Sequence, residues 1–218
     1  MFDFQILVDS LPTLMKAGVV TVKMTFISAL LSLFFGAISC MLQLSNIRGG
    51  YWVSRTYVSI MRGTPLVVQL FLVFFSLPMV GIKGQAFLAA VIAIGLNSGA
   101  YTSEILRAAV QSIHSGQIEA GETIGMRRLT IWRRIMLPQA FVLSIPALTA
   151  EFTIVLKSTP LASIIAVTEL TYAGVLIQAR TYSALEVLLP VASTYILIAV
   201  AFMRLSRWLE NHFSVYRA

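Results

Sequence analysis

Long apolar runs constrain the possible folds of this chain more than any other feature. Residues Met24 to Leu44 form 21 consecutive positions without Asp, Glu, Lys or Arg, and a helix needs about 20 mainly apolar residues to cross a bilayer. Charged residues make up only 11% of the chain, against about 25% in a typical soluble domain. A soluble fold of this size would need more polar side chains on its outside. The sequence therefore predicts an all-α integral membrane protein.

The apolar runs predict about five transmembrane helices in a single domain, residues 1–218. The second apolar run, residues 65–80, is too short to cross alone, so its helix should begin earlier and kink at Thr64–Pro65. Pro146 is expected to interrupt the fourth span. Residues 164–177 are expected to form a partial or interfacial helix. The expected spans are residues 21–44, 53–80, 85–113, 138–156 and 185–206.

The distribution of Lys and Arg predicts the orientation of these spans. Basic residues concentrate in the cytosolic segments of membrane proteins. Eleven of the 16 basic residues fall on the side that holds the C-terminus: Arg48, Arg55, Arg62, Arg107, Arg127, Arg128, Arg133, Arg134, Arg204, Arg207 and Arg217. The N-terminus is therefore expected outside and the C-terminus in the cytosol. The net charge of +7 then reflects topology and contact with membrane lipid, and no nucleic-acid partner is expected.

The densest block of charge lies between the third and fourth spans. Glu119 and Glu122 follow Ser115-Gly116, where acidic residues suit the start of a helix. Gly125 can adopt a turn conformation that other residues resist. The pattern predicts a short helix, a turn, and a second amphipathic helix along the membrane surface, before Pro138 begins the next span. By these features alone, an ordinary positively charged loop remains an alternative.

The spacing inside this block resembles the EAA loop of ABC transporter permeases. Three residues separate the triplet Glu119-Ala120-Gly121 from Gly125, and nine separate Gly125 from Ile135. Gly121 replaces the alanine usual in the third position. In that family the loop forms cytosolic coupling helices, here about residues 116–136, which dock into a groove on an ATPase subunit. The resemblance implies a coupling role for Glu119, Ala120, Gly121, Gly125, Ile135, Leu137 and Pro138.

Other stretches are similar to permeases of the polar amino acid uptake type. They are RGTPLVVQLF (62–71), AYTSEILRAAVQSI (100–113), GQIEAGETIGM (116–126) and LPQAF (137–141). The resemblance implies a subunit of an ATP-driven importer for polar amino acids in a bacterial cytoplasmic (inner) membrane. Two departures concern the expected translocation path: Lys157-Ser158-Thr159-Pro160 replaces the usual Lys-Asp-Thr-Ser, and Ala150 replaces an Asn that often precedes the acid at Glu151.

The same resemblance implies the partners. They are a second permease subunit, identical or paralogous, cytosolic ATP-binding subunits and an extracytoplasmic solute-binding protein. The chain contains no G-x-x-x-x-G-K-[ST] phosphate loop. We therefore expect ATP and Mg to bind the partner ATPase, with no cofactor and no enzymatic activity on this chain.

Other functional classes fit the sequence less well. A secondary amino acid transporter, or another small-solute carrier, is the main alternative, but such proteins are usually longer and built from internal repeats. His114, His212 and Cys40 are widely separated, so no metal site is expected. Neither histidine is placed to activate Ser98 as a nucleophile.

Glu151 is the outstanding charge inside a predicted span. A carboxylate at membrane depth usually faces a partner or a wet cavity. It could meet the ammonium group of a substrate, pair with a Lys or Arg on another helix, or remain a protonated structural acid. Lys157 could be its partner or a gate residue near the outer surface.

Further polar and small residues lie at membrane depth. Thr64, Asn97 and Ser98 are candidates for the substrate pathway, although Asn97 and Ser98 could equally form hydrogen bonds between helices. Glu104 and Arg107 are three apart and should form an ion pair on one helix face. Close helix packing is expected at Gly63, Gly95 and Gly99.

Overall fold

The computed structural model describes residues 4–45, 47–82 and 85–213. In these ranges it contains helices and no strand, which confirms the predicted fold class. In chain order, the elements are α1 (Phe4–Leu44), α2 (Arg48–Gly63), α3 (Leu66–Ser76), the 3₁₀ helix η1 (Leu77–Val80), α4 (Ala86–Gln111), α5 (Ser115–Thr123), α6 (Arg128–Ile131), the π-helix η2 (Trp132–Met136), α7 (Leu137–Ser158), the 3₁₀ helix η3 (Thr159–Ile165), α8 (Leu170–Thr181) and α9 (Ala184–Phe213).

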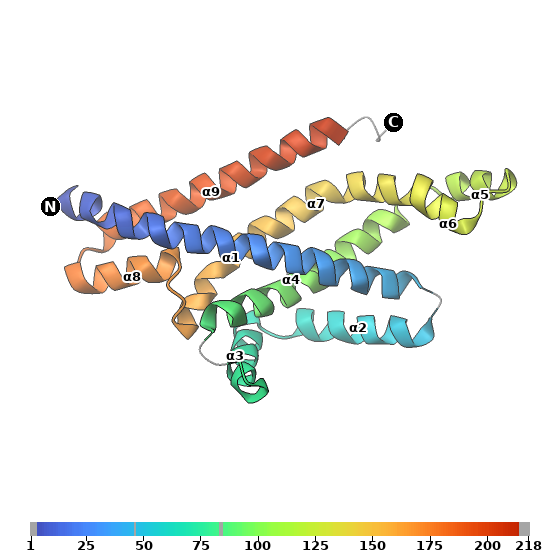
Figure 1. The fold of residues 1–218 in the computed structure, drawn as a ribbon. Helices are drawn as coiled ribbons and strands as arrows, with labels where there is room; N and C mark the ends of the chain where they lie inside the picture. The colour runs from blue at the N-terminus through green and yellow to red at the C-terminus, as the bar shows by residue number, and fades with distance from the viewer. Residues whose placement is uncertain (1–3, 46, 83–84, 214–218) are drawn as a thin grey trace.

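The long helices form an elongated bundle (Figure 1). Four helical stretches are long and apolar enough to cross a membrane: α1, α4, residues 128–165 and residues 184–205. The bent pair of α2 and α3 gives a fifth if it is one span, so the prediction of about five spans is confirmed. The N-terminus and α8 lie at one end of the bundle, and α5 and α6 extend from the other (Figure 1).

Helix α1 is much longer than the span expected at residues 21–44. Its 41 residues correspond to about 60 Å of helix, roughly twice the hydrocarbon thickness of a bilayer. The added N-terminal turns are stabilised by tertiary packing, because Leu14 and Ala17 are buried against Leu170, Ala173 and Val191 of α8 and α9. An amphipathic contact of this kind is invisible to a search for uniformly apolar runs.

Small residues bring α1 and α4 into close contact. A Cβ on Gly99 would lie 3.3 Å from Cβ of Phe35, and one on Gly95 would lie 2.8 Å from Leu31. Close approach through such residues is common in membrane bundles, and the prediction for Gly95 and Gly99 is confirmed. The prediction for Gly63 is wrong, because a Cβ there would meet no atom within 4 Å.

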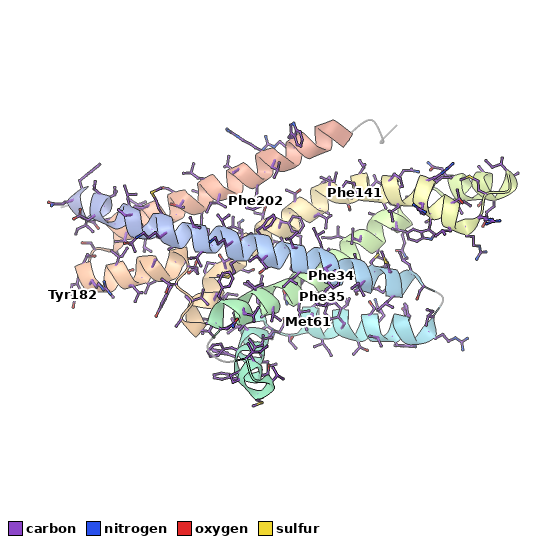
Figure 2. The ribbon with its side chains drawn as sticks, viewed as in Figure 1. Phe34, Phe35, Met61, Phe141, Tyr182 and Phe202 are labelled. Atoms are coloured by element: carbon purple, nitrogen blue, oxygen red, sulfur yellow. The ribbon has the colours of Figure 1, made fainter. Side chains whose placement is uncertain are left out.

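The second span is broken rather than kinked. The axes of α2 and α3 differ by 110° across the Thr64–Pro65 break (Figure 1). Because Pro65 has no amide hydrogen, carbonyls near the break need other donors. The side-chain nitrogen of Gln69 donates to the Met61 carbonyl at 2.9 Å and to Thr64 Oγ1 at 2.7 Å. Asn97 of α4 donates to the same Met61 carbonyl at 2.9 Å; Met61 lies at the end of α2 in Figure 2.

Replacing Gln69 with Leu is expected to destabilise the protein by about 1–3 kcal/mol, because the hydrogen bonds of the buried Gln69 amide to Thr64 and to the Met61 carbonyl are lost, and Met61 keeps only the Asn97 donor. The matched control is Ser76→Ala, since among the described residues the exposed Ser76 hydroxyl donates to the Val73 carbonyl of its own helix, α3; we expect about 0.5 kcal/mol or less there. Thermal unfolding of the purified protein in detergent measures both variants. An unchanged unfolding temperature for the Leu variant would contradict this account of the break.

Three local expectations in the second half of the chain need correction. The helix that begins at Arg128 is not a separate surface helix, because it continues through η2 into α7. Pro146 does not interrupt α7, which remains helical from Leu137 to Ser158. The partial helix expected at residues 164–177 is shifted towards the C-terminus, as α8, Leu170–Thr181.

Glu169 explains where α8 begins. Its fully buried carboxylate accepts hydrogen bonds from the amides of Tyr172 at 2.7 Å and Thr171 at 3.0 Å. The Tyr195 hydroxyl of α9 donates to the same carboxylate at 2.7 Å. Such a cap satisfies donors that the first turn of a helix leaves unpaired, so Glu169 determines the start of α8 and ties it to α9.

Candidate functional site

A cavity of about 540 Å³ opens between α4, α7 and the end of α2. Apolar side chains of α4 and α7 form much of its wall. The polar lining consists of Arg62, Tyr101, Glu104, Ser112, Ser144 and Glu151. Both signs of charge therefore face one cavity in a bundle that otherwise carries few charges.

Glu151 lies on the α7 side of this cavity and is 5% exposed. One of its carboxylate oxygens accepts a hydrogen bond of 2.7 Å from the Ser98 hydroxyl of α4. Ser98 is itself 3.0 Å from the Ser32 hydroxyl, which lies 2.7 Å from Thr102 Oγ1. These buried hydroxyls hold the carboxylate in one orientation against α4.

Lys157 does not pair with Glu151. It is exposed, six residues further along α7, and among the described residues Glu151 forms no ion pair with any base. Among the described residues, the Glu151 carboxylate accepts a hydrogen bond from a hydroxyl, that of Ser98. Charge compensation for Glu151 must therefore come from a proton, from another subunit or from a ligand.

Arg62, near the end of α2, lies beside the middle of α4. Its guanidinium carbon is 5.1 Å from the centre of the Tyr101 ring. Tyr101 is ten residues before the end of α4 at Gln111, which is about 15 Å along a helix. The span predicted at residues 53–80 contains Arg62, and the structure shows that α2 carries its side chain back to the middle of α4.

The other predicted polar residues divide into two groups. The ion pair expected between Glu104 and Arg107 is present, with both side chains partly buried. Thr64 and Asn97 lie at the break between α2 and α3, where both contact Gln69. The structure thus brings Ser98 and Glu151 together, and it places Thr64 and Asn97 in the adjacent wall.

Helix α5, in the segment that carries the predicted coupling residues, ends in a left-handed turn. Gly125 has φ = 80°, a conformation that favours glycine. Its amide donates to the Glu122 carbonyl at 3.0 Å, and the Met126 amide donates to the Gly121 carbonyl at 3.0 Å. This pair of bonds is the Schellman termination of a helix, so Gly125 ends α5 and reverses the chain.

Residues of this segment that are distant in sequence contact one another. Gly121 is buried, and a Cβ on it would lie 3.1 Å from Ile131 and 3.4 Å from Ile135. The Gln139 side chain donates to the Gln117 side chain at 2.6 Å and to the Ile135 carbonyl at 2.8 Å. A small residue at position 121 is therefore needed for α5 to pack against α6 and η2.

The remaining predicted coupling residues border this packed turn. Glu119, Ala120 and Leu137 are exposed, and Pro138 is at the start of α7. Sequence reasoning had not singled out Gln69, Gln139 or the depth of Arg62, although all three lie within quoted stretches. The available signal for Gln69 was an amide side chain inside an apolar run, which needs a partner at membrane depth.

A helical membrane bundle with a charged cavity at mid-depth and an exposed helical turn at one end belongs to the class of membrane transport proteins. Comparison with known proteins identifies the family. The family described as "Binding-protein-dependent transport system inner membrane component" matches residues 32–215. The chain belongs to this family and is a multi-pass permease subunit of an ABC transport system.

Several characterised permeases are similar over most of the chain. The nopaline transport system permease protein NocM of Agrobacterium fabrum is 35% identical over 224 residues, covering 96% of this chain and 93% of that protein. The glutamine transport system permease protein GlnP of Escherichia coli K12 is 34% identical, covering 98% and 99%. The L-cystine transport system permease protein TcyB of Bacillus subtilis is 45% identical over 150 residues, covering 69% of this chain and 64% of that protein.

Solved structures of ABC transporters have the same fold as this chain. A crystal structure described as an amino acid ABC transporter with histidines superposes with a TM-score of 0.89 and 32% identity, covering 97% of this chain and 99% of that one. An inward-facing MetNI methionine ABC transporter shares the fold, with a TM-score of 0.72 and 21% identity over 90% of this chain and 96% of that one.

Proposed function

We propose that this chain forms the translocation pathway of an ATP-driven importer for polar amino acids. The observation that carries the proposal is the buried Glu151 carboxylate, which lines the cavity without a basic partner among the described residues. A carboxylate there complements the ammonium group that amino acids carry. The names of similar proteins support this substrate class, since they include transport systems for L-cystine, arginine and glutamine.

Within this pathway, Ser98 orients Glu151 by donating a hydrogen bond to it. Thr64 and Asn97 maintain the wall beside the cavity through their bonds at the α2–α3 break. Lys157, exposed near the end of α7, acts as a gate residue on the outer side. No metal participates in this scheme.

The turn at Gly125 couples the pathway to an ATPase. Glu119, Ala120, Gly121, Gly125, Ile135, Leu137 and Pro138 build or border this turn. Two apolar side chains beside it support docking of another protein, because Ile124 is 77% exposed and Leu129 is 70% exposed. ATP and Mg bind the ATPase, and this chain contributes no cofactor and no catalytic group.

The complete importer contains two permease subunits, identical or paralogous. Two cytosolic ATP-binding subunits contact the α5–α6 end, and an extracytoplasmic solute-binding protein contacts the opposite end. Closure of the ATPases moves α5 and rocks the spans between inward-facing and outward-facing states. The assembly sits in the bacterial cytoplasmic membrane in contact with lipid, and it binds no nucleic acid.

The N-terminus faces outside and the C-terminus faces the cytosol in this proposal. The four arginines at residues 127–134, at the α5–α6 end, support that orientation. Cysteines at exposed Ala179 and Thr123, in a Cys40→Ser background, test it. An impermeant thiol reagent added to intact cells should label Ala179→Cys, and should label Thr123→Cys only after permeabilisation. The opposite pattern reverses the topology.

Reconstitution tests the function itself. The permease, its ATPase and its binding protein in proteoliposomes should show ATP hydrolysis stimulated by at least one polar amino acid, with accumulation of that amino acid. A secondary transporter would instead accumulate substrate under an ion gradient without ATP. Uptake that does not depend on ATP would therefore refute the proposal and favour a secondary transporter.

A further inference from the structure

We propose that Arg62 binds the carboxylate of the transported amino acid while Glu151 faces its ammonium group. The cavity would thus recognise both charges of the zwitterion. This inference rests on the function proposed above and names the chemistry of its binding site.

The two charged side chains reach the cavity from different helices, on either side of α4. Arg62 comes from the end of α2 and lies over Tyr101 of α4. Glu151 comes from α7 and accepts a hydrogen bond from Ser98 of α4. Ser98 and Tyr101 are three residues apart, so they are neighbours within one turn of α4. Opposite charges are therefore held at a similar depth, across one cavity.

The in-plane N–H groups of the Arg62 guanidinium can accept a further partner that offers a hydrogen-bond acceptor. In the described ranges it makes no ion pair, and its contact is the face of the Tyr101 ring. A guanidinium that stacks on a ring can still direct its in-plane N–H groups towards a carboxylate. The nearby Glu104 is bonded to Arg107 through one carboxylate oxygen only, because its other oxygen has no hydrogen-bond partner among the described residues, and Glu151 is the second acid of the cavity.

The position of Arg62 beside the middle of α4 makes this arrangement informative: Glu151 is buried, whereas the Arg62 side chain is exposed in the single subunit. An arginine at membrane depth is unfavourable unless it faces water or a partner, and such residues usually mark substrate pathways. The cavity volume of about 540 Å³ falls within the range of about 300–1,000 Å³ that small-molecule sites show. The space and both charges therefore match a small zwitterion, whereas an amine or an ester would leave Arg62 without an anionic partner.

Ligand affinity measured on the purified permease–ATPase complex, without the binding protein, tests this assignment. The probes are the amino acid that best stimulates the wild type and its methyl ester, which lacks the carboxylate charge. The wild type should bind the amino acid about 10- to 100-fold more tightly than the ester. Arg62→Gln should weaken amino acid binding by a similar factor and change ester binding by less than about twofold.

Arg55→Gln is the matched control. Arg55 lies seven residues earlier on α2 and lines a neighbouring hollow with Arg62 and Tyr101, but not the cavity that contains Glu151. Removing its charge should leave both affinities within about twofold of the wild type, given that surface substitutions have small effects. An equal loss in both variants would show general electrostatic attraction and overturn the specific role of Arg62.

The other outcomes separate this inference from the proposed function. If the wild type binds no amino acid, the proposed function fails. If the wild type binds one and Arg62→Gln binds it equally well, only the role of Arg62 fails. If Arg62→Gln does not assemble, Arg62→Lys decides: the retained charge should keep a preference for the amino acid over the ester, and equal affinities for the two would overturn the inference.

Discussion

Glu151→Gln is expected to remove most substrate-stimulated ATP hydrolysis while basal hydrolysis by the assembled complex persists. The amide keeps the shape of the side chain and its contact with Ser98, but it removes the charge that the ammonium group needs. A charge-assisted hydrogen bond is worth about 1.5–3 kcal/mol. The amino acid concentration for half-maximal stimulation should therefore rise about 10- to 100-fold, as measured by ATPase assays in proteoliposomes.

Glu169→Gln is the matched control, because Glu169 is also a buried acid. Its carboxylate caps α8 and lies away from the cavity, so this change should lower thermal stability without altering the substrate dependence of ATP hydrolysis. Normal transport by Glu151→Gln would show that Glu151 is only a structural acid. Failure of that variant to assemble would instead identify Glu151 as a helix-pairing residue.

Gly125→Val is expected to uncouple transport from ATP hydrolysis without preventing membrane insertion. A β-branched residue is strongly disfavoured at φ = 80°, and a left-handed conformation costs an ordinary residue about 1–2 kcal/mol. The chain must then abandon the turn that ends α5. Uptake of the amino acid per unit of inserted protein should fall severalfold or more, while the amount in the membrane stays near wild type.

Gly125→Asn separates backbone conformation from side-chain size. Asn tolerates the left-handed region better than other non-glycine residues, and open space surrounds position 125. The Asn variant should therefore retain most uptake. If the Val variant transports normally, Gly125 has no role in coupling; if the Asn variant fails as completely as Val, a requirement other than backbone conformation governs the site.

The class of the protein and much of its local structure follow from the sequence alone. Span length depends on consecutive apolar residues, so hydropathy locates α4 and the core of α1 directly. A disruption of the helix at Pro65 and the turn at Gly125 follow from single-residue backbone properties, whereas the 110° angle at Pro65 does not. The spaced motif around Glu119 identified the family before any contact was known. These features share one property, since each depends on residues close together in the chain.

The site depended on contacts between helices, and only the tertiary structure decided those. The depth of Arg62 results from the direction in which α2 returns along α4, which the sequence of α2 does not state. The bond from Ser98 to Glu151 and the packing of Gly121 on Ile135 require a particular rotation of each helix. Hydropathy leaves rotation undetermined because apolar side chains cover most of each helix surface. Packing of small residues and pairing of buried polar groups select the rotation instead.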